Sequence, residues 1–211
     1  MKTMLLLVCL ISVTACHRAS QNARVSGTEI KAVSAATPHP PNPPSAPRPT
    51  EAEVRAAIQR TYADAVTLDK TSSTPFIVGD FNGDDSEDIA IVVKPRNEKL
   101  SELNSEYVNW ILEDPQHIQQ IAHDVKAKDT LLAVIHGRER EGWRNDRARQ
   151  TYLLKNAVGT EVTTESINQL RTSGEARALP QLWGDVIREK LNGSAGIIYW
   201  AGGKYAWHPI S

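Results

Sequence analysis

Apolar positions in residues 50–211 follow two periods, that of an amphipathic helix at the start and that of short strands in most of the remainder. Thr50 precedes the first helical repeat, and Glu53 occupies the position from which a capping-box side chain bonds back to it. The pattern predicts a helix over residues 51–66, packed by one apolar stripe on a sheet. The stripe consists of Val54, Ile58, Tyr62 and Ala65 or Val66.

Short runs rich in β-branched and aromatic residues, bounded by polar or glycine-bearing segments, predict strands along the rest of the domain. These runs are residues 76–78, 89–93, 131–135, 151–154, 186–189, 197–200 and 204–207. We expect them to pair as hairpins in an antiparallel sheet.

The last two runs predict a hairpin that turns at the Gly-Gly pair between them. In that register Trp200 faces Tyr205 and Ile198 faces Trp207, so all four side chains share one side of the ribbon. We expect that side to be core, because a large apolar side chain gains roughly 1.5–3 kcal/mol by leaving water. The alternative is an open aromatic platform of Trp200, Tyr205 and Trp207 that stacks on a glycan or peptidoglycan.

Helical spacing returns in residues 103–112 and again in residues 114–125, where Asp114 would cap a helix that Pro115 opens. A shorter helix is expected near residues 165–171. The whole pattern predicts one α+β domain over residues 50–211. Its features would be an antiparallel, hairpin-rich sheet, a packed N-terminal amphipathic helix and a helical insertion.

The N-terminus has the order of an export signal, namely Met-Lys, an apolar run over residues 4–11, and the small-residue exit Val13-Thr14-Ala15-Cys16. The run is shorter than the roughly 20 residues that span a bilayer, which indicates a cleaved segment. Val13-Thr14-Ala15-Cys16 resembles the bacterial lipobox. That resemblance implies a signal peptide over residues 1–15 and lipidation of Cys16, with ordinary secretion as the alternative.

Residues 16–49 would form a tether, because they contain few periodic apolar positions and seven of the chain's 12 prolines. Such a composition favours extended polyproline II, although a proline-recognition ligand is the functional alternative. His17 and Arg18 follow the cysteine, and the lipobox resemblance without an Asp there implies the outer membrane. We therefore expect a lipid-anchored protein of the bacterial cell envelope, facing the periplasm or the surface.

Charge and cysteine content exclude several classes of function for the folded part. Beyond residue 49 the chain holds 19 basic and 24 acidic residues, a net charge of about −5, which argues against a nucleic-acid partner. The two cysteines, Cys9 and Cys16, both precede that part. It therefore has no disulfide, zinc cluster or cysteine nucleophile.

Oxygen-bearing side chains alternate through residues 80–88, between the first two predicted strands. Ca²⁺ takes six to eight oxygen ligands from carboxylates, amides and backbone carbonyls together, and crowded carboxylates repel one another without a cation. The sequence therefore predicts a calcium site, with a solvated acidic loop as the alternative. Its ligands would be the side chains of Asp80, Asn82, Asp84 and Asp88 and the carbonyl of Ser86.

This loop resembles the calcium loop of FG-GAP and integrin-like β-propeller repeats, whose pattern is Asp-x-Asn-x-Asp-Gly-x-x-Asp between two strands. Asp85 stands where that family prefers glycine, at a backbone position that often needs a positive φ, which aspartate tolerates better than most residues. A single copy excludes a propeller. The loop is not an EF-hand, because Ile91 stands where that motif has a bidentate glutamate.

Catalytic motifs are absent from the sequence: it contains no Gly-x-Ser-x-Gly and no His-Glu-x-x-His. His117 and His123 would point to different sides of a helix, and His136 ends a strand without a partner that the sequence can name. We expect a calcium-stabilised binding or structural domain. A metal-dependent hydrolase using the acidic loop and a glycan-binding module remain as alternatives.

Overall fold

The computed structural model describes residues 47–105, 108–119, 124–173 and 179–210. The predicted signal peptide, Cys16 and the predicted tether up to residue 46 lie outside the described residues. Residues 46–211 form one compact unit, and it contains all the hydrophobic clusters described below. None of the helices in the described ranges is long and apolar enough to cross a membrane.

Helix α1 (Glu51–Tyr62) begins at the capping box, in which the Thr50 hydroxyl accepts the Glu53 N–H and the Glu53 carboxylate accepts the Thr50 N–H. Its buried residues are Val54, Ala57, Ile58 and Tyr62. The helix ends at Tyr62 rather than at residue 66, because Ala63 adopts a positive φ of 50°. The next residues, predicted as helix, form strand β1 (Val66–Leu68).

Six strands form the first sheet: β1, β2 (Phe76–Gly79), β3 (Asp88–Pro95), β4 (Ile111–Glu113), β5 (Leu131–Ile135) and β6 (Thr151–Leu154). Their order is β1-β3-β5-β6-β4, and β2 pairs with the first half of β3 while β1 pairs with its end. All pairs are antiparallel except β4 with β6, which is parallel.

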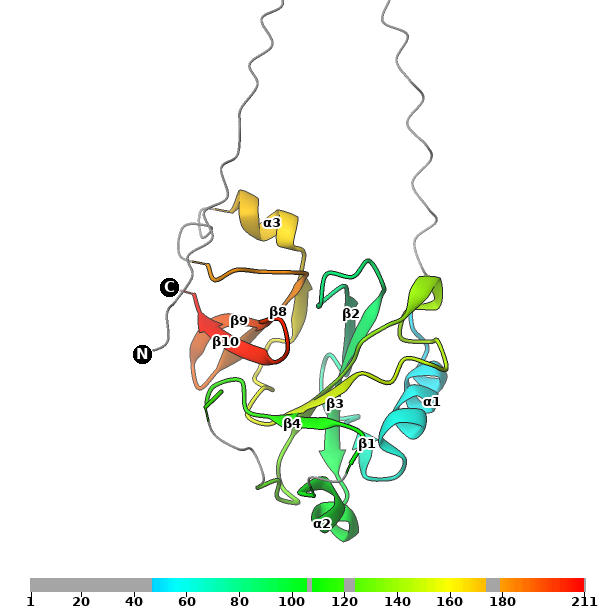
Figure 1. Ribbon diagram of the computed structural model, residues 1–211. Coiled ribbons are helices and arrows are strands. Elements are labelled where there is room, and N and C mark those ends of the chain that lie inside the picture. Colours follow the sequence, from blue (N-terminus) through cyan, green and yellow to red (C-terminus); the bar gives the residue numbers. More distant parts are fainter. Residues whose placement is uncertain (1–46, 106–107, 120–123, 174–178, 211) are drawn as a thin grey trace, which may run out of the picture. The chain divides into compact units, whose positions relative to one another are not determined.

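Strand β3 is the centre of the domain, because both of its faces are buried. Ile89, Ile91 and Val93 pack toward α1, whereas Ala90 and Val92 pack into a second apolar cluster. A strand buried on both faces has a continuous apolar run instead of alternation, and this accounts for the sequence of residues 89–93. Figure 1 shows α1 on one side of β3 and strands β8 to β10 on the other.

The second sheet holds β7 (Thr163–Glu165), β8 (Val186–Leu191), β9 (Ser194–Trp200) and β10 (Tyr205–Pro209) in the order β10-β9-β8-β7. One face packs on the first sheet through side chains such as Ile187 and Ile198. The short helix α3 (Ile167–Thr172), near the position predicted for it, covers the other face with Leu170. The single sheet expected from the sequence is therefore two packed sheets.

The predicted β9–β10 hairpin is confirmed in its register: Trp200 pairs with Tyr205, and Ile198 pairs with Trp207. The N–H of Ala201 donates to the carbonyl of Lys204 at 2.8 Å, which closes the turn. All four facing side chains belong to the cluster between the sheets, Trp200 and Trp207 being partly buried there.

The predicted helical insertion is wrong for the residues that the structure describes. Residues 97–103 contain a 3-10 turn, η1 (Asn97–Lys99), and one helical turn, α2 (Leu100–Leu103), and β4 follows at Ile111. Asp114 does not cap a helix there: its carboxylate accepts the N–H of Gln116 at 3.0 Å within a turn. An Asp-Pro pair starts turns as readily as helices. Here the pairing of the preceding strand β4 with β6 favours the turn.

Candidate metal loop

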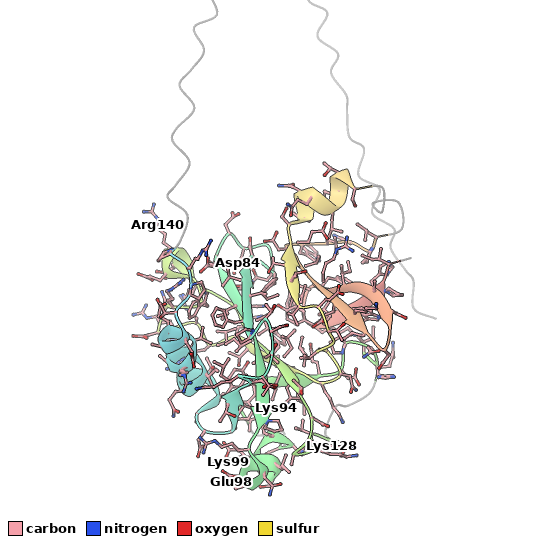
Figure 2. All side chains as sticks on the ribbon, turned by 180° about the vertical axis from the view of Figure 1, so that it is seen from behind. Asp84, Lys94, Glu98, Lys99, Lys128 and Arg140 are labelled. Carbon is pink, nitrogen blue, oxygen red and sulfur yellow. The ribbon has the colours of Figure 1, made fainter. Side chains whose placement is uncertain are left out.

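The acidic loop connects β2 to β3, whose pairing ends at Gly79 opposite Asp88. Figure 2 shows Asp84 of this loop at one end of the domain and Glu98 and Lys99 at the other. Asp84 is exposed and Asp80 is half-buried, so the loop has an open side. A shallow depression of about 470 Å³ lies along its flank, lined by residues that include Asp80 and Asp85.

Asp80 organises the first half of the loop by accepting backbone hydrogen bonds on both carboxylate oxygens. Oδ1 accepts the N–H groups of Gly83 at 2.8 Å and Asp84 at 3.0 Å, and Oδ2 accepts the N–H of Asp85 at 2.9 Å. Burial raises the pKa of Asp80, the negative charge of Asp84 adds to that shift, and the backbone donors oppose it. Three backbone N–H groups of the loop therefore point to the single carboxylate of Asp80.

Asn82 and Asp84 also accept backbone hydrogen bonds within the loop, each from the N–H two residues later. Asn82 Oδ1 accepts the Asp84 N–H at 3.1 Å, and Asp84 Oδ1 accepts the Ser86 N–H at 2.9 Å. The Asn82 amide also donates to Asp84 Oδ2 at 2.9 Å. These bonds hold three predicted ligand positions in one ordered turn.

Asp88 lies at the base of the loop and is fully buried. Its Oδ2 accepts the N–H groups of Phe81 at 2.9 Å and Asn82 at 3.3 Å, and its Oδ1 accepts the N–H of Gly137 at 2.6 Å. Burial, together with the charges of Asp84 and Asp80, raises its pKa to about 7. Asp88 thus ties the loop to the segment after β5.

The backbone restricts which residues can occupy two positions of the loop. Asp85 has a φ of 65°. This confirms the positive φ that was predicted at this position of the loop. Gly83 has a φ of 75°, and a Cβ there would lie 2.2 Å from the carbonyl oxygen of Trp183. Gly83 is therefore required both by its conformation and by a close backbone approach.

The fit of the loop to a cation is mixed. Carboxylate and amide oxygens of Asp80, Asn82 and Asp84 suit a hard ion, and a carboxylate has about four acceptor positions, so backbone donors do not exhaust them. In the described ranges, however, no group of three or more His, Cys, Asp or Glu side chains is arranged so that it could hold a metal ion. Asp88 is fully buried and both of its oxygens face backbone donors, so it is the least accessible of the predicted side-chain ligands.

Glu87 fixes the end of the loop to Trp143 and Arg144, which lie far from it in the sequence. Its carbonyl accepts the Trp143 N–H at 2.7 Å, and its Oε1 accepts the Trp143 indole N–H at 2.9 Å and Arg144 Nη1 at 2.7 Å. Arg144 also donates to Glu53 of α1 at 2.9 Å. The loop is thereby joined to the first helix through one arginine.

Asp185 fixes the other end of the loop to the second sheet. The Asp185 N–H donates to the Asp80 carbonyl at 2.7 Å, and Asp185 Oδ2 accepts the Asp80 N–H at 3.2 Å. Oδ1 accepts the N–H of Ile167 at the start of α3 at 3.3 Å. A Cβ on the preceding Gly184 would lie 2.2 Å from the Asp80 carbonyl oxygen, so the two backbones are in contact.

The aromatic residues proposed as a platform form part of a buried cluster. Tyr205 is 1% exposed, and its hydroxyl lies 2.7 Å from Nε2 of His136, which is itself buried. Tyr152, Trp200, Tyr205 and His136 have ring centroids 5.0 to 5.8 Å apart. Tyr205 therefore has no open ring face for a ligand, whereas Trp200 and Trp207 are partly buried against the cluster between the sheets.

His136 has the partner that the sequence did not name. Burial lowers its pKa to about 4, so the ring is neutral at physiological pH, and its Nδ1 has no hydrogen-bond partner. A buried neutral histidine bonded to a tyrosine is a feature of the core between the sheets and is not presented to solvent. His117 lies beside Asp114 at 3.0 Å on an exposed turn, and His123 lies outside the described ranges.

Comparison with protein-family models, with curated proteins and with solved structures finds no match. The interpretation of the loop therefore depends on its own geometry. The loop joins several parts of the domain, because residues 80–88 contact the segment after β5 and the residue that precedes β8, and they reach α1 through Arg144. The sequence indicated the loop itself but not Glu87, Trp143 or Asp185 as its supports. Gly83 and Gly184 were the local signs of the close approach between the two backbones.

Proposed function

We propose that this chain is a lipid-anchored protein of the bacterial cell envelope whose folded part is a binding or structural domain stabilised by one Ca²⁺ in residues 80–88. Export and lipidation at Cys16 rest on the N-terminal pattern, and the outer membrane is the expected location. The observation that carries the calcium proposal is the ordered, acidic turn formed by Asp80, Asn82 and Asp84 at the junction of the domain.

A cation in this loop would act as a structural ion. It would offset the repulsion among the carboxylates of Asp80, Asp84 and Asp88. Burial raises the pKa values of Asp80 and Asp88, and the charges of the neighbouring carboxylates add to that rise. A ligand that binds the native loop and not the unfolded chain stabilises the fold by mass action. Because the loop joins both sheets to α1, that stabilisation would reach the whole domain.

The test is a calcium-dependent melting curve with a matched pair of variants. Saturating calcium is expected to raise the melting temperature by about 5 to 10 °C, and chelator is expected to reverse the rise. Asp84→Asn should lose this response. Glu98→Gln, which removes the same charge from an exposed position at the other end of the domain, should keep it.

Two outcomes would contradict the calcium proposal. One is a melting temperature that neither calcium nor chelator changes in the unmodified protein. The other is a response that Asp84→Asn and Glu98→Gln share. The hydrolase alternative makes the opposite prediction, because Asp84→Asn would then abolish activity while the melting curve stays constant.

The anchor is tested separately from the loop. Mass spectrometry of the protein purified from bacterial membranes is expected to find acyl chains on an N-terminal Cys16, and Cys16→Ser should release the protein from the membrane fraction. An intact N-terminus at Met1, or membrane association that survives Cys16→Ser, would contradict lipidation. Neither result bears on calcium binding.

A further inference from the structure

A small cavity outside the metal loop lies between the end of α1 and the start of β6. Its volume is about 190 Å³, and it is lined by Arg60, Thr61, Asn109, Arg149 and Thr151. Two of these five residues carry guanidinium groups, and none is acidic. A polar wall with two positive charges is the composition of a site for an anion.

Arg60 forms the better ordered part of this wall. It stands in the last turn of α1, is partly buried, and donates from Nη2 to the carbonyl of Trp143 at 2.7 Å. Its Nε is buried and has no hydrogen-bond partner. Burial lowers the pKa of Arg60, and the charge of Arg149 shifts that pKa in the same direction, whereas Asp146 opposes both effects.

Neither guanidinium of the cavity takes part in an ion pair with an acidic side chain of the described residues. Asp146 acts on the charge of Arg60 without forming an ion pair with it, so both positive groups face the cavity without a carboxylate bonded to them. A second cavity, of about 260 Å³, is a contrasting case, because its positive charges are neutralised. Its cations have acidic neighbours, since Arg55 and Lys70 lie beside Glu51 and Arg96 lies beside Glu98.

The two hydroxyl groups of the cavity are held by the backbone. Thr61 donates to the carbonyl of Ala57 at 2.8 Å, and Thr151 donates to the carbonyl of Asn109 at 3.2 Å. Their protons are already used, so an anion would take its hydrogen bonds from the guanidinium groups and from the Asn109 amide. The threonines instead fix the shape of the wall.

We infer that this cavity binds the phosphate or sulfate group of a small molecule, or the free inorganic ion, with Arg60 at the inner wall and Arg149 at the mouth. Arg149 is exposed and Arg60 is partly buried, which gives the site a solvent-facing and an inner donor. A planar guanidinium presents paired N–H donors that match two oxygens of such a group. The site is independent of the calcium loop and of the proposed function.

Titration calorimetry on the full-length protein in detergent, in calcium-free Tris-chloride buffer, tests the site. Inorganic phosphate, sulfate and glycerol 3-phosphate are the three probes, and saturable binding of one molecule per chain is expected for at least one of them. Binding of the ester but not of inorganic phosphate would identify the small-molecule source, and the reverse would identify the free ion.

A matched pair of arginine variants separates the cavity from general surface charge. Arg149→Met should weaken binding by about tenfold or more, as expected for loss of a charge-assisted hydrogen bond. Arg147→Met removes the same charge from an exposed position close by that does not line the cavity, and it should change the affinity less than twofold. Equal weakening in both variants would overturn the assignment.

A third variant tests the guanidinium at the inner wall. Arg60→Lys keeps the positive charge but removes Nε and the planar donor pair, and it should weaken binding by about tenfold while the far-ultraviolet circular dichroism stays unchanged. Unaltered affinity in a folded Arg60→Lys protein would contradict the role of Arg60. Absence of saturable binding for all three probes would overturn the whole inference. Because Arg149 is exposed, its variant remains informative even if Arg60→Lys fails to fold.

Discussion

Glu87 holds Trp143 at two points: its carbonyl accepts the backbone N–H at 2.7 Å, and its carboxylate accepts the indole N–H at 2.9 Å. Trp143 is buried, and Arg144 stacks over its ring while bonding to the same carboxylate oxygen. The end of the acidic loop is therefore fixed by a residue 56 positions away in the sequence. This contact makes the loop part of the core and not only a surface turn.

Replacing Trp143 by Phe is expected to destabilise the domain by about 2 to 4 kcal/mol, because it removes a hydrogen bond to a carboxylate and leaves unfilled volume in the core. Trp183→Phe is the matched control, since Trp183 is 56% exposed. It should change the free energy of unfolding by about 0.5 kcal/mol or less. Urea denaturation followed by circular dichroism measures both, and equal effects would show that the Glu87 contact contributes little.

Replacing Gly83 by Ala tests the close approach between the loop and the segment before β8. The added Cβ would lie 2.2 Å from the Trp183 carbonyl oxygen at a φ of 75°, so both strain and a clash oppose it. Gly193→Ala isolates the strain, because its φ of 84° is similar and nothing lies within 4 Å of the added Cβ. We expect about 1 kcal/mol of destabilisation at Gly193 and about 3 kcal/mol or more at Gly83.

Comparison with the control Gly193→Ala shows which result would contradict the prediction at Gly83. If the two variants have the same free energy of unfolding in urea, the backbone of Trp183 can move away at no cost. The loop and the second sheet would then not be in fixed contact. The pair of Asp185 bonds to Asp80 would be the next contact to examine.

The sequence predicted those features of the fold that depend on residues close to one another in the chain. The loop between β2 and β3 could be located from the sequence because its polar residues are close together in the chain, and its bonds run between positions two to five residues apart, as from Asp80 to Gly83 and Asp85. Strand β3 and the β9–β10 register were foreseen for the same reason, since the apolar run and the Gly-Gly turn are local. The supports of the loop were not, because Asp185 reaches Asp80 across 105 residues.

Three short strands were missed because they owe their structure to their partners. Strands β1, β4 and β7 have three residues each, too few for a period to be visible. Strand β4 pairs in parallel with β6, and this pairing overrides the helical spacing around Leu103 and Trp110. The second sheet was merged with the first, because alternation along a strand does not tell which other sheet covers its face.

Replacing Tyr205 by Phe is expected to destabilise the domain by about 1 to 3 kcal/mol, because Nε2 of the buried His136 would then lose its hydrogen-bond partner. Tyr199→Phe on the neighbouring strand is the matched control, since Tyr199 is only partly buried and packs against the outer cluster of the second sheet. Its effect on the free energy of unfolding should be smaller by at least about 1 kcal/mol. No difference between the two variants would mean that His136 finds another partner.

Replacing Glu189 by Gln should stabilise the domain above neutral pH and flatten its pH dependence. Glu189 is 3% exposed, and burial raises its pKa to about 7. The folded state therefore holds a proton that the unfolded chain has already released. Because the raised pKa belongs to the folded state, the stability it contributes is complete below pH 4.5 and is lost as the pH rises through about 7.

An amide in place of this carboxyl can keep the acceptor that now receives the N–H groups of Gly159 at 3.1 Å and Lys190 at 3.2 Å. Its NH₂ group would replace Oε1, which has no hydrogen-bond partner. Relative to the unmodified protein, Glu189→Gln should gain about 1 to 3 kcal/mol between pH 5 and pH 8 in urea denaturation series. Glu98→Gln, at an exposed carboxylate, should not change the slope. A parallel pH profile for Glu189→Gln and the unmodified protein would show that Glu189 is ionised in the folded state at pH 5, in contradiction to a pKa raised by its burial.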